Sequence, residues 1–550
     1  MEKEKKKLIV CIVLSFVFLM LCTTVTVATR SIYWADDINF HFSRFNGIKD
    51  AILGGQFPIK YYNNWTHGGG YISSIFYGDL FLIPFVLLSF LGIPLKVCYF
   101  LFIYALYFLF WVAMFFFSKK YLKSNGLSVL CATIFTCSSY MYCEIFFRAA
   151  FGEAIGILFY FVLLIAIYNL LHEDYSKPWL FTIAFLGMLF SHMTTLIVAT
   201  VTLVLVVLFN CKKLFCDKTF WIKSGIALAV FLVIGLYFIA SFIELYFADT
   251  YYISTPWKIP SDFALSLAEI LGILSKVGVG IIVILAFFPR LFISRKNSET
   301  KEDVKTIDRF LIISVILMFL ISKIFPWKLF DSSLSFFQFP WRLNFIITIL
   351  LSIAVCLEIN ILRKTKINYI KVALVVYFCF SLLSNSKFYD PSMLPNEFVS
   401  NYSEKVEWHP VELVMEDFKD RNIYDNNGNA VEYSRKEYTT DITFVCDESC
   451  EYYIVPLTYY KGYTATLTTD QSEKENLEIS CFENGMILVK TNGSNGKIFI
   501  HYSGTTTQTV TFWISFSSTI LLSFGAITYV VVKKKKEIYK KINTNKKQKK

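Results

Sequence analysis

Two adjacent carboxylates, Asp36 and Asp37, stand near the start of the sequence, just after its first apolar run. Burying carboxylates beside such a run is costly, so the pair needs a chemical or a structural reason. General base catalysis is one reason, because a carboxylate can take a proton from an attacking hydroxyl. Helix capping is the other, because Asp stabilises the first turn of a helix. From spacing alone the two interpretations have about equal weight.

A helix predicted over residues 37–53 would gather polar side chains next to this pair. Asp37, His41 and Arg44 have the spacing i, i+4, i+7, so they share one helix face. The apolar residues of the same helix are predicted to lie at the membrane interface, and they are Phe40, Phe45, Ile48 and Ile52. The pattern thus predicts a carboxylate, an imidazole and a guanidinium at the level of the lipid headgroups.

Further charged or polar residues stand at the ends of later apolar runs. Arg148 and Glu153 flank the start of one run, and either they bind a ligand or they anchor a span boundary. Arg342 begins another run, where it is either a phosphate ligand or a snorkelling side chain. His192 lies between two apolar helices, where it is either a site residue or a hydrogen-bonded core histidine.

The elements that must position these residues are membrane spans. Hydrophobic residues make up 55% of the 550 positions and charged residues only 17%, which excludes an ordinary soluble domain of this length. Apolar runs long enough to cross about 30 Å of hydrocarbon predict an α-helical polytopic membrane protein with about twelve spans. The first run, from Leu8 to Ala28, is interpreted as a retained anchor.

Charge placement predicts the topology. The net charge of +11 lies largely beside the spans and in the lysine-rich tail, so it indicates cytoplasmic loops and no nucleic-acid partner. Both termini are predicted to be cytoplasmic, in a multi-pass protein of the cell membrane. Charge and parity alone then bring several polar residues to the extracytoplasmic side, and these are Asp36, Asp37, Arg148, Glu153, His192 and Arg342. Residues 76–92 are predicted to lie along the interface, which preserves the even number of crossings.

The predicted domain organisation follows this threading. Residues 1–385 form the multi-span domain, with the external loop 29–75, and residues 386–510 form an extracytoplasmic domain. Residues 511–532 form the last transmembrane helix and residues 533–550 a basic cytoplasmic tail.

The extracytoplasmic domain is predicted to be β-rich from about residue 440. Turns are predicted at Asn484-Gly485 and Asn495-Gly496, and the strands are predicted over Ile442 to Cys446, Tyr452 to Val455, Tyr463 to Leu467, Met486 to Val489 and Lys497 to Tyr502. Three cysteines of this domain could pair on an oxidising side, and they are Cys446, Cys450 and Cys481.

A set of short motifs runs along nearly the whole chain. It comprises Asp37-Ile-Asn-Phe-His41-x-x-Arg44, Gly55-Gln-Phe-Pro58, Ile75-Phe-Tyr-Gly-Asp79, Arg148-Ala-Ala-Phe-Gly-Glu153-Ala, Ser191-His192, Gln338-Phe-Pro-Trp-Arg342 and Pro456-Leu-Thr-Tyr-Tyr-Lys-Gly462-Tyr. With its acidic first loop and terminal domain, the chain resembles the C-type superfamily of membrane glycosyltransferases. More narrowly, the motifs resemble a family of large bacterial membrane proteins, some labelled as related to 6-pyruvoyl-tetrahydropterin synthase and others YfhO-like. The histidines do not support pterin chemistry.

The resemblance implies transfer of a sugar from a polyprenyl-phosphate donor to a cell-envelope acceptor, which is a glycan, a lipid or a protein. It implies that Asp36 or Asp37 is the base, with Asp37 slightly favoured. The leaving phosphate needs a cationic side chain or a divalent cation held by carboxylates. The residues assigned to substrate binding are His41, Arg44, Arg148, Glu153, His192 and Arg342. A non-catalytic transporter of lipid-linked glycans and an envelope assembly factor are the alternatives.

Overall fold

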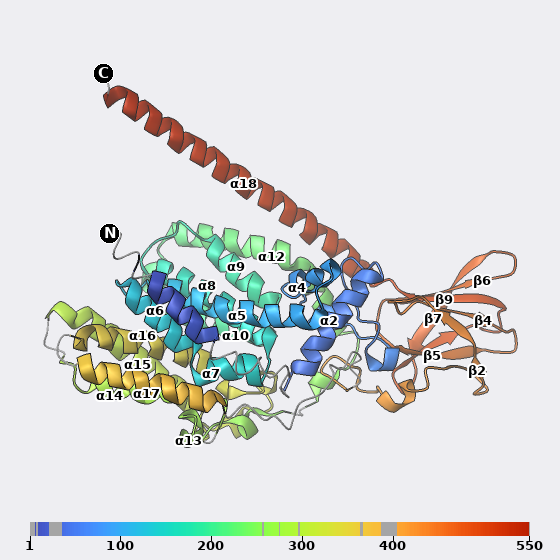
Figure 1. Ribbon diagram of the computed structural model, residues 1–550. Helices are drawn as coiled ribbons and strands as arrows, with labels where there is room; N and C mark the ends of the chain where they lie inside the picture. Colours follow the sequence, from blue (N-terminus) through green and yellow to red (C-terminus); the bar gives the residue numbers. More distant parts are fainter. Residues whose placement is uncertain are drawn as a thin grey trace.

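The computed structural model describes residues 6, 9–20, 36–255, 258–273, 275–294, 298–363, 367–386 and 404–548. The chain is mostly helical, and a β-sheet follows the main helical part. Figure 1 shows the sheet at one end of the helical body, while α18 begins beside the sheet and ends far from it.

The helical body is built from long apolar helices joined by short helical turns. In chain order the long helices are Ile9–Met20, α2 (Ile38–Leu53), α5 (Leu95–Ser118), α6 (Asn125–Thr136), α8 (Phe151–Leu171), α9 (Trp179–Leu189), α10 (Met193–Phe209), α12 (Lys218–Tyr246), α14 (Ile282–Arg290), α15 (Lys301–Ile321), α16 (Asn344–Leu362), α17 (Ile367–Ser386) and α18 (Thr506–Gln548). The short ones include α3 (Ser73–Phe76), α4 (Ile83–Leu87), η2 (Leu88–Leu91), α7 (Ser139–Tyr142), η3 (Cys143–Phe147), α11 (Cys211–Leu214), α13 (Leu267–Ile270) and η9 (Pro340–Leu343).

Five helices of the described residues are long and apolar enough to cross a membrane, or six if a bent pair counts as one span. They are Leu95–Ser118, Phe151–Leu171, Lys218–Tyr246, Pro340–Leu362 and Thr506–Lys536, and the bent pair is Asn125–Thr136 with Ser139–Phe147. These helices are compatible with a multi-pass membrane protein. The predicted number of about twelve spans is not confirmed, because several predicted spans are short helices such as α9 and α10.

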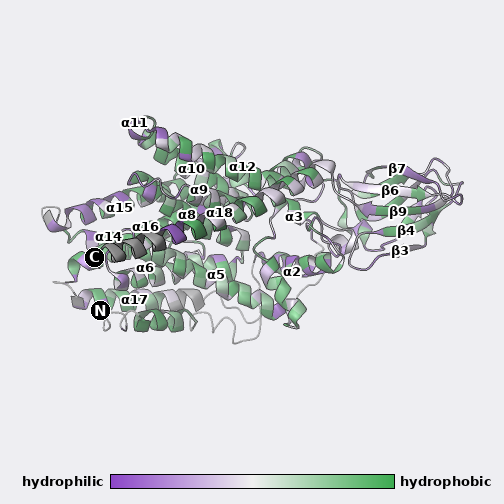
Figure 2. Cartoon of the chain, turned by 90° about the horizontal axis from the view of Figure 1, so that it is seen from above, coloured by the Kyte–Doolittle hydropathy of each residue, from purple (hydrophilic) through white to green (hydrophobic). Residues whose placement is uncertain are grey.

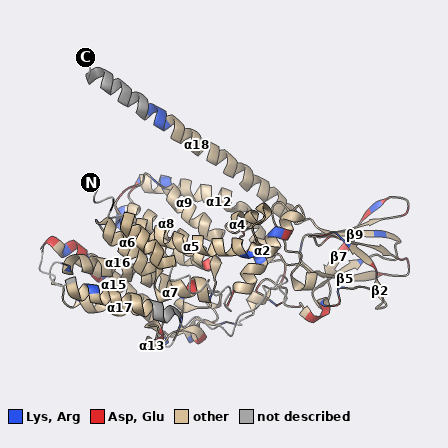
Figure 3. Ribbon diagram, viewed as in Figure 1, with Lys and Arg blue, Asp and Glu red and all other residues tan. Residues whose placement is uncertain are grey.

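The distribution of apolar and charged residues along the chain follows this pattern. Figure 2 shows that the helices consist largely of hydrophobic residues, and Figure 3 shows Lys, Arg, Asp and Glu mainly near the ends of the helical body and on the sheet. Within the most apolar window of each helix, α16 is 67% buried whereas α18 is only 6% buried. Helix α16 therefore belongs to the packed core, whereas most of this part of α18 is not buried by the rest of the protein.

The span predicted over residues 264–288 is wrong as a single helix. Its two helical pieces, α13 and α14, are separated by a glycine-rich connection. Gly272 and Gly280 have φ values of +72° and +90°, which side chains other than glycine rarely adopt. A Cβ on Gly278 would lie 2.1 Å from the carbonyl oxygen of Glu269, so the chain turns back closely on itself there.

The stretch predicted to lie along the interface contains only short helical pieces. Residues 76–92 hold the last residue of α3, then α4 and η2, and α5 runs without interruption from Leu95 to Ser118. The interfacial position of this stretch stays a prediction. The first predicted span is confirmed as helix only over Ile9–Met20, and the rest of Leu8 to Ala28 lies outside the described residues.

The sheet has nine antiparallel strands in the order β2-β1-β5-β8-β7-β6-β9-β4-β3. Their bounds are β1 Ile423–Asp425, β2 Ala430–Val431, β3 Tyr433–Arg435, β4 Ile442–Cys446, β5 Tyr452–Thr458, β6 Tyr463–Thr468, β7 Lys474–Cys481, β8 Met486–Lys490 and β9 Gly496–Tyr502. The five predicted strands are confirmed as β4, β5, β6, β8 and β9. The β1, β2, β3 and β7 strands escaped prediction because their sequences are short or strongly polar.

One of the two predicted turns is confirmed. Residues 482–485 connect β7 to β8, with the Gly485 amide donating to the Phe482 carbonyl. The predicted turn at Asn495-Gly496 is wrong, because Gly496 opens β9 and the turn lies at Asn492-Gly493. A Cβ on Gly496 would lie 2.5 Å from the Thr468 carbonyl oxygen, so this glycine allows close strand approach instead. Cys446, Cys450 and Cys481 form no disulfide with any described residue.

The segment from Asp36 to Asp79 connects the sheet to the helical body. Arg435 of β3 donates from Nη1 to the Gly68 carbonyl at 2.6 Å and from Nη2 to the Asn63 carbonyl at 2.9 Å. The Thr458 amide of β5 donates to the Gly69 carbonyl at 2.8 Å. These bonds hold the sheet against the segment that carries the acidic pair.

Candidate functional site

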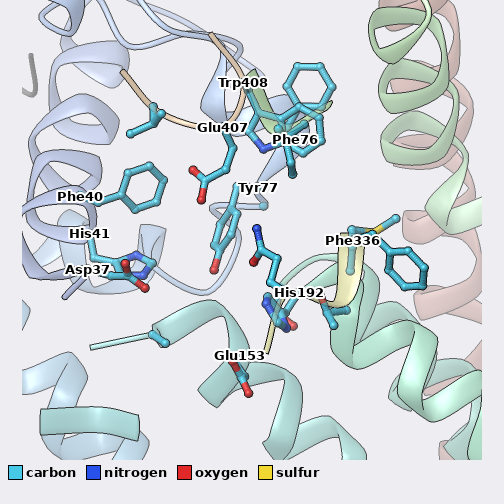
Figure 4. A pocket seen from close by; sticks show the side chains of 18 of the residues that line it. Asp37, Phe40, His41, Phe76, Tyr77, Glu153, His192, Phe336, Glu407 and Trp408 are labelled. Atoms are coloured by element: carbon cyan, nitrogen blue, oxygen red, sulfur yellow. The ribbon is translucent and has the colours of Figure 1, made fainter. Parts of the chain in front are cut away.

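A cavity of about 330 Å³ lies where the start of α2, the starts of α8 and α10, and residues 404–408 before the sheet meet. All of the predicted site residues except Arg44 line it, namely Asp36, Asp37, His41, Arg148, Glu153, His192 and Arg342. These residues come from segments far apart in the sequence, and Figure 4 shows several of them facing one space. The grouping expected from charge and parity is therefore present in three dimensions.

Helix N-termini converge on this cavity. Asp37, Ala150 and His192 are the N-cap residues of α2, α8 and α10. Arg342 lies in η9, directly before α16. Helix N-termini favour negative charge through their dipoles and unpaired N–H groups, so this end of the cavity suits an anion.

Main-chain hydrogen bonds fix the acidic pair against two residues shortly before α8. The Asp36 amide donates to the Phe147 carbonyl at 3.1 Å, and the Asp37 amide donates to the Arg148 carbonyl at 2.9 Å. Asp37 is the N-cap residue of α2, yet its side chain makes no capping hydrogen bond. Capping by this carboxylate therefore does not explain its presence.

The two carboxylates differ in their surroundings. Asp36 is exposed, whereas Asp37 is only partly exposed, at the wall of the cavity. Burial raises the pKa of Asp37 to about 6, although Arg148 opposes this shift. Partial loss of hydration beside the cavity also raises the pKa of Asp36, against the lowering effects of Arg148, Lys258 and Lys276. A carboxylate with a pKa near 6 is well matched to general base catalysis close to neutral pH.

A buried ion-pair network forms the floor of the cavity. Glu153 Oε2 accepts from Arg148 Nη1 at 3.1 Å and from Arg342 Nε at 3.2 Å, and Arg148 Nη1 also pairs with Glu144 at 2.5 Å. Tyr140 donates to the other Glu153 oxygen at 3.4 Å. Glu153 thus has a positioning role, because its charge is used to hold two guanidinium groups side by side.

The two arginines have different capacity for a ligand. Arg342 gives its Nη1 to the Phe337 carbonyl at 2.9 Å and its Nη2 to Gln338 at 3.4 Å. Arg148 lies over the Trp341 ring at 4.4 Å, and both of its ion pairs use Nη1. Among the described residues, its Nε and Nη2 have no hydrogen-bond partner. Arg148 is therefore better placed than Arg342 to bind an anion.

Arg44 is the predicted site residue that does not line the cavity. It is buried about one helical turn beyond His41, where Nη2 pairs with Asp79 at 2.7 Å. The predicted interfacial face of α2 is also corrected, because Phe45 and Ile48 are fully buried in the protein core. The helix packs against protein on several sides. The prediction that its apolar face lies at the membrane interface is therefore wrong.

His41 is fully buried, and its imidazole contributes to the cavity wall. Its Nδ1 lies 3.2 Å from Arg44 Nη1, while its Nε2 has no hydrogen-bond partner. Burial holds the pKa of His41 well below its usual range, and the Arg44 charge adds to this effect. His41 is thus an uncharged imidazole. His192 lies across from it, with its Nδ1 bonded to Thr195.

Sequence reasoning missed several residues of the cavity wall. Lys258 and Glu407 bring a cation and a carboxylate from irregular segments that carry no motif. Tyr77 and Phe76 were within a quoted motif but had no assigned role. Phe76 stacks on Trp408 with ring centroids 4.1 Å apart and an interplanar angle of 4°. The cavity therefore has an aromatic wall as well as a charged floor.

A second, apolar groove of about 460 Å³ lies among α8, α9, α10 and α12. All four helices also reach the polar cavity, through Glu153 of α8, Leu189 of α9, Met193 of α10 and Phe238 of α12. Along α10 the groove is lined as far as Val207, which is about 21 Å from Met193 at the rise of an α-helix. The two spaces thus share helices that run from one to the other.

Among the residues that the structure describes, no three His, Cys, Asp or Glu side chains are grouped to hold a metal ion. The divalent cation considered from the sequence remains a prediction without assigned ligands.

In comparisons with known proteins, no protein-family model matches the chain and no curated protein matches it. The resemblance to C-type glycosyltransferases therefore rests on the motifs alone.

Proposed function

We propose that the protein is a membrane glycosyltransferase that transfers a sugar from a polyprenyl-phosphate donor to an extracytoplasmic acceptor of the cell envelope. The observation that carries the proposal is the single cavity that joins Asp37, with its raised pKa, to Arg148 and Lys258. A base and a site for an anionic leaving group are the two requirements of this reaction.

In the proposed step, the acceptor hydroxyl gives its proton to the Asp37 carboxylate. The hydroxyl oxygen then forms a bond to the anomeric carbon of the donor, while the bond between that carbon and the phosphate oxygen breaks. The electron pair of the broken bond leaves with the polyprenyl phosphate, whose charge Arg148 and Lys258 stabilise. No acid is needed for the leaving group, because a phosphate departs as an anion.

The aromatic wall and the apolar groove support the choice of a lipid-linked sugar. Trp408, which is partly exposed and stacks on the buried Phe76, offers flat apolar surface of the kind that packs against a sugar ring. The groove along α10 offers a path for a hydrocarbon chain whose phosphate is held in the cavity. A donor with a charged head, a sugar and a long chain would use all three surfaces.

The proposed orientation follows from the same reaction. The cavity would open on the extracytoplasmic side of the cell membrane, and both termini would be cytoplasmic. The positively charged end of α18, with Lys533, Lys534, Lys535 and Lys536, fits a cytoplasmic position under the positive-inside rule.

The proposal is tested in cells by comparing the envelope glycans of strains that carry wild-type protein, Asp37→Asn or the Asp36→Asn/Asp37→Asn double variant. The expected result is loss of one glycan in the double variant and at least a strong reduction in Asp37→Asn. Asp470→Asn is the control, because this carboxylate is exposed in the turn between β6 and β7. An unchanged glycan profile from a stably expressed double variant contradicts the proposal and favours the transporter or assembly factor.

A further inference from the structure

Arg44 contacts His41 from about one helical turn further along α2, and it is not among the residues that line the cavity. Its Nη1 lies 3.2 Å from His41 Nδ1. A guanidinium carries only donors, so Nδ1 must be the acceptor of this hydrogen bond. In an uncharged imidazole with Nδ1 as acceptor, the proton is on Nε2. The tautomer of His41 therefore follows from the identity of its neighbour.

Arg44 itself is held firmly in this position. Its Nε and Nη2 donate to Asp79 Oδ1 at 3.2 and 2.7 Å, and Nη2 also donates to the Gly78 carbonyl at 2.9 Å. The other Asp79 oxygen accepts from Tyr62 at 2.5 Å and from Ser74 at 2.7 Å. The bonds from both sides fix the guanidinium, so it cannot turn away from the imidazole.

The Nε2–H group of His41 is a buried donor with no partner. Such groups are uncommon, because an unsatisfied buried donor loses its hydrogen bonds to water without replacement. His41 lines the cavity and stands one helical turn after Asp37, the residue proposed as the base. A ligand atom that accepts a hydrogen bond would satisfy it next to the reacting hydroxyl.

We propose that Arg44 is a positioning residue that holds His41 as an Nε2–H donor, and that this donor binds a hydroxyl oxygen of the sugar of the lipid-linked donor. This inference rests on the proposed function. An uncharged donor suits a hydroxyl, whereas the cations suited to phosphate are Arg148 and Lys258. The same geometry excludes His41 as the base, because Nδ1 is occupied and Nε2 already carries a proton.

Nitrogen NMR of the protein labelled with ¹⁵N-histidine tests the tautomer directly, since the two ring nitrogens differ in shift when only one is protonated. The His41 signals are assigned by their absence from His41→Gln. The expected result at neutral pH is a protonated Nε2 and an unprotonated Nδ1. A protonated Nδ1 overturns the inference whatever the reaction of the protein.

The positioning role is tested with Arg44→Lys. The single ammonium group of Lys keeps the charge next to Asp79, but it cannot bond to Asp79 and to His41 at the same time. The expected result is a mixture of His41 tautomers in a folded protein. Arg435→Lys is the control, because Arg435 is a partly buried arginine that also donates to backbone carbonyls but does not contact His41. An unchanged tautomer in folded Arg44→Lys overturns the role of Arg44.

The ligand class is tested by adding undecaprenyl phosphate glucose, undecaprenyl phosphate mannose or undecaprenyl phosphate to the labelled protein. A change in the His41 Nε2 shift is expected with at least one sugar lipid and not with undecaprenyl phosphate alone. Equal changes with all three lipids, or none with any, overturn the assignment to a hydroxyl. If the shift changes as expected but no sugar is transferred, the proposed function fails and the inference about His41 stands.

Two substitutions add a functional measurement. His41→Gln places an amide N–H near the position of Nε2, whereas His41→Asn is too short to reach it. For the transfer reaction we expect His41→Gln to keep kcat/KM within about threefold of wild type and His41→Asn to lower it about tenfold or more. Equal losses in both variants contradict a hydrogen bond from this position.

Discussion

Arg148 Nη1 and Glu153 Oε2 lie 3.1 Å apart at the floor of the cavity, and the same carboxylate oxygen accepts from Arg342 Nε at 3.2 Å. A single buried carboxylate thus holds two guanidinium groups together. Without it they would repel each other in a low-dielectric setting. The network links the start of α8 to the start of α16, and so it fixes the cation that would meet a phosphate.

The first prediction concerns this network. Glu153→Gln should destabilise the protein by about 3–5 kcal/mol, because it leaves two buried cations with one fewer counter-charge. The measurement is the free energy of unfolding, or the shift of Tm, of the purified protein in detergent. Glu302→Gln is the control, since its partner Lys305 and its own side chain are both exposed, and its Tm should not change. A Tm equal to that of wild type in Glu153→Gln would show that the network carries no stability.

The second prediction concerns Gly152 in α8. A Cβ at this position would lie 2.0 Å from Tyr77 Oη and 2.5 Å from its Cζ, so Gly152→Ala must displace the Tyr77 ring from the cavity. We expect weaker binding of undecaprenyl phosphate sugars, measured by titration of the purified variant, and partial recovery when Tyr77 is also changed to Ala. Gly225→Ala is the control, because nothing lies within 4 Å of its Cβ in α12. Unchanged binding in Gly152→Ala contradicts a role for the Tyr77 position.

The third prediction concerns pH. Since burial raises the pKa of Asp37 to about 6, the base is protonated and inactive below that pH. The transfer rate should therefore fall about tenfold for each pH unit below about 6. Lys258 lowers the pKa of Asp37, so Lys258→Met should move this limb to higher pH. Lys323→Met, an exposed cation that does not line the cavity, should leave the limb in place. A transfer rate that stays constant over about four pH units around this pKa would exclude Asp37 as the base.

The fourth prediction concerns the apolar groove. Thr200 is exposed on α10 and lines the groove, whereas the neighbouring Val201 is exposed and does not line it. Thr200→Trp should weaken the binding of undecaprenyl phosphate about tenfold, because the indole fills space meant for the chain. Val201→Trp is the control. Geranyl phosphate, which is too short to reach along the groove, should bind Thr200→Trp and Val201→Trp alike. Equal effects of Thr200→Trp and Val201→Trp would contradict the assignment of the chain to this groove.

Local patterns predicted local structure well. The 3.6-residue periodicity after Asp37 predicted α2 within one residue of its start, and alternation predicted β4 and β9 nearly to the residue. Such elements depend on neighbouring residues, whose types are visible in the sequence. By contrast, β7 has the sequence Lys-Glu-Asn-Leu-Glu-Ile-Ser-Cys, and it forms because β6 and β8 offer hydrogen-bonding edges on both sides.

The cavity was predictable in part for the same reason. Charge and parity depend on the whole chain, so they brought Asp37, Arg148, His192 and Arg342 to one end of the helices. They carried no information about Lys258 and Glu407, which lie in irregular segments whose course is set by packing. Helix spacing assigned Arg44 to the cavity, but spacing does not reveal that this guanidinium pairs with Asp79 inside the protein.

Transfer of labelled sugar by purified protein in liposomes is the most direct test of the central claim. Undecaprenyl phosphate glucose and undecaprenyl phosphate mannose, each labelled in the sugar, are supplied with an envelope extract as acceptor. The proposed function predicts label in the acceptor and release of undecaprenyl phosphate with wild type, and loss of both with Asp37→Asn, while Asp470→Asn behaves as wild type. Equal transfer by folded wild type and the Asp36→Asn/Asp37→Asn variant, or movement of the labelled lipid across the bilayer without transfer, would contradict it.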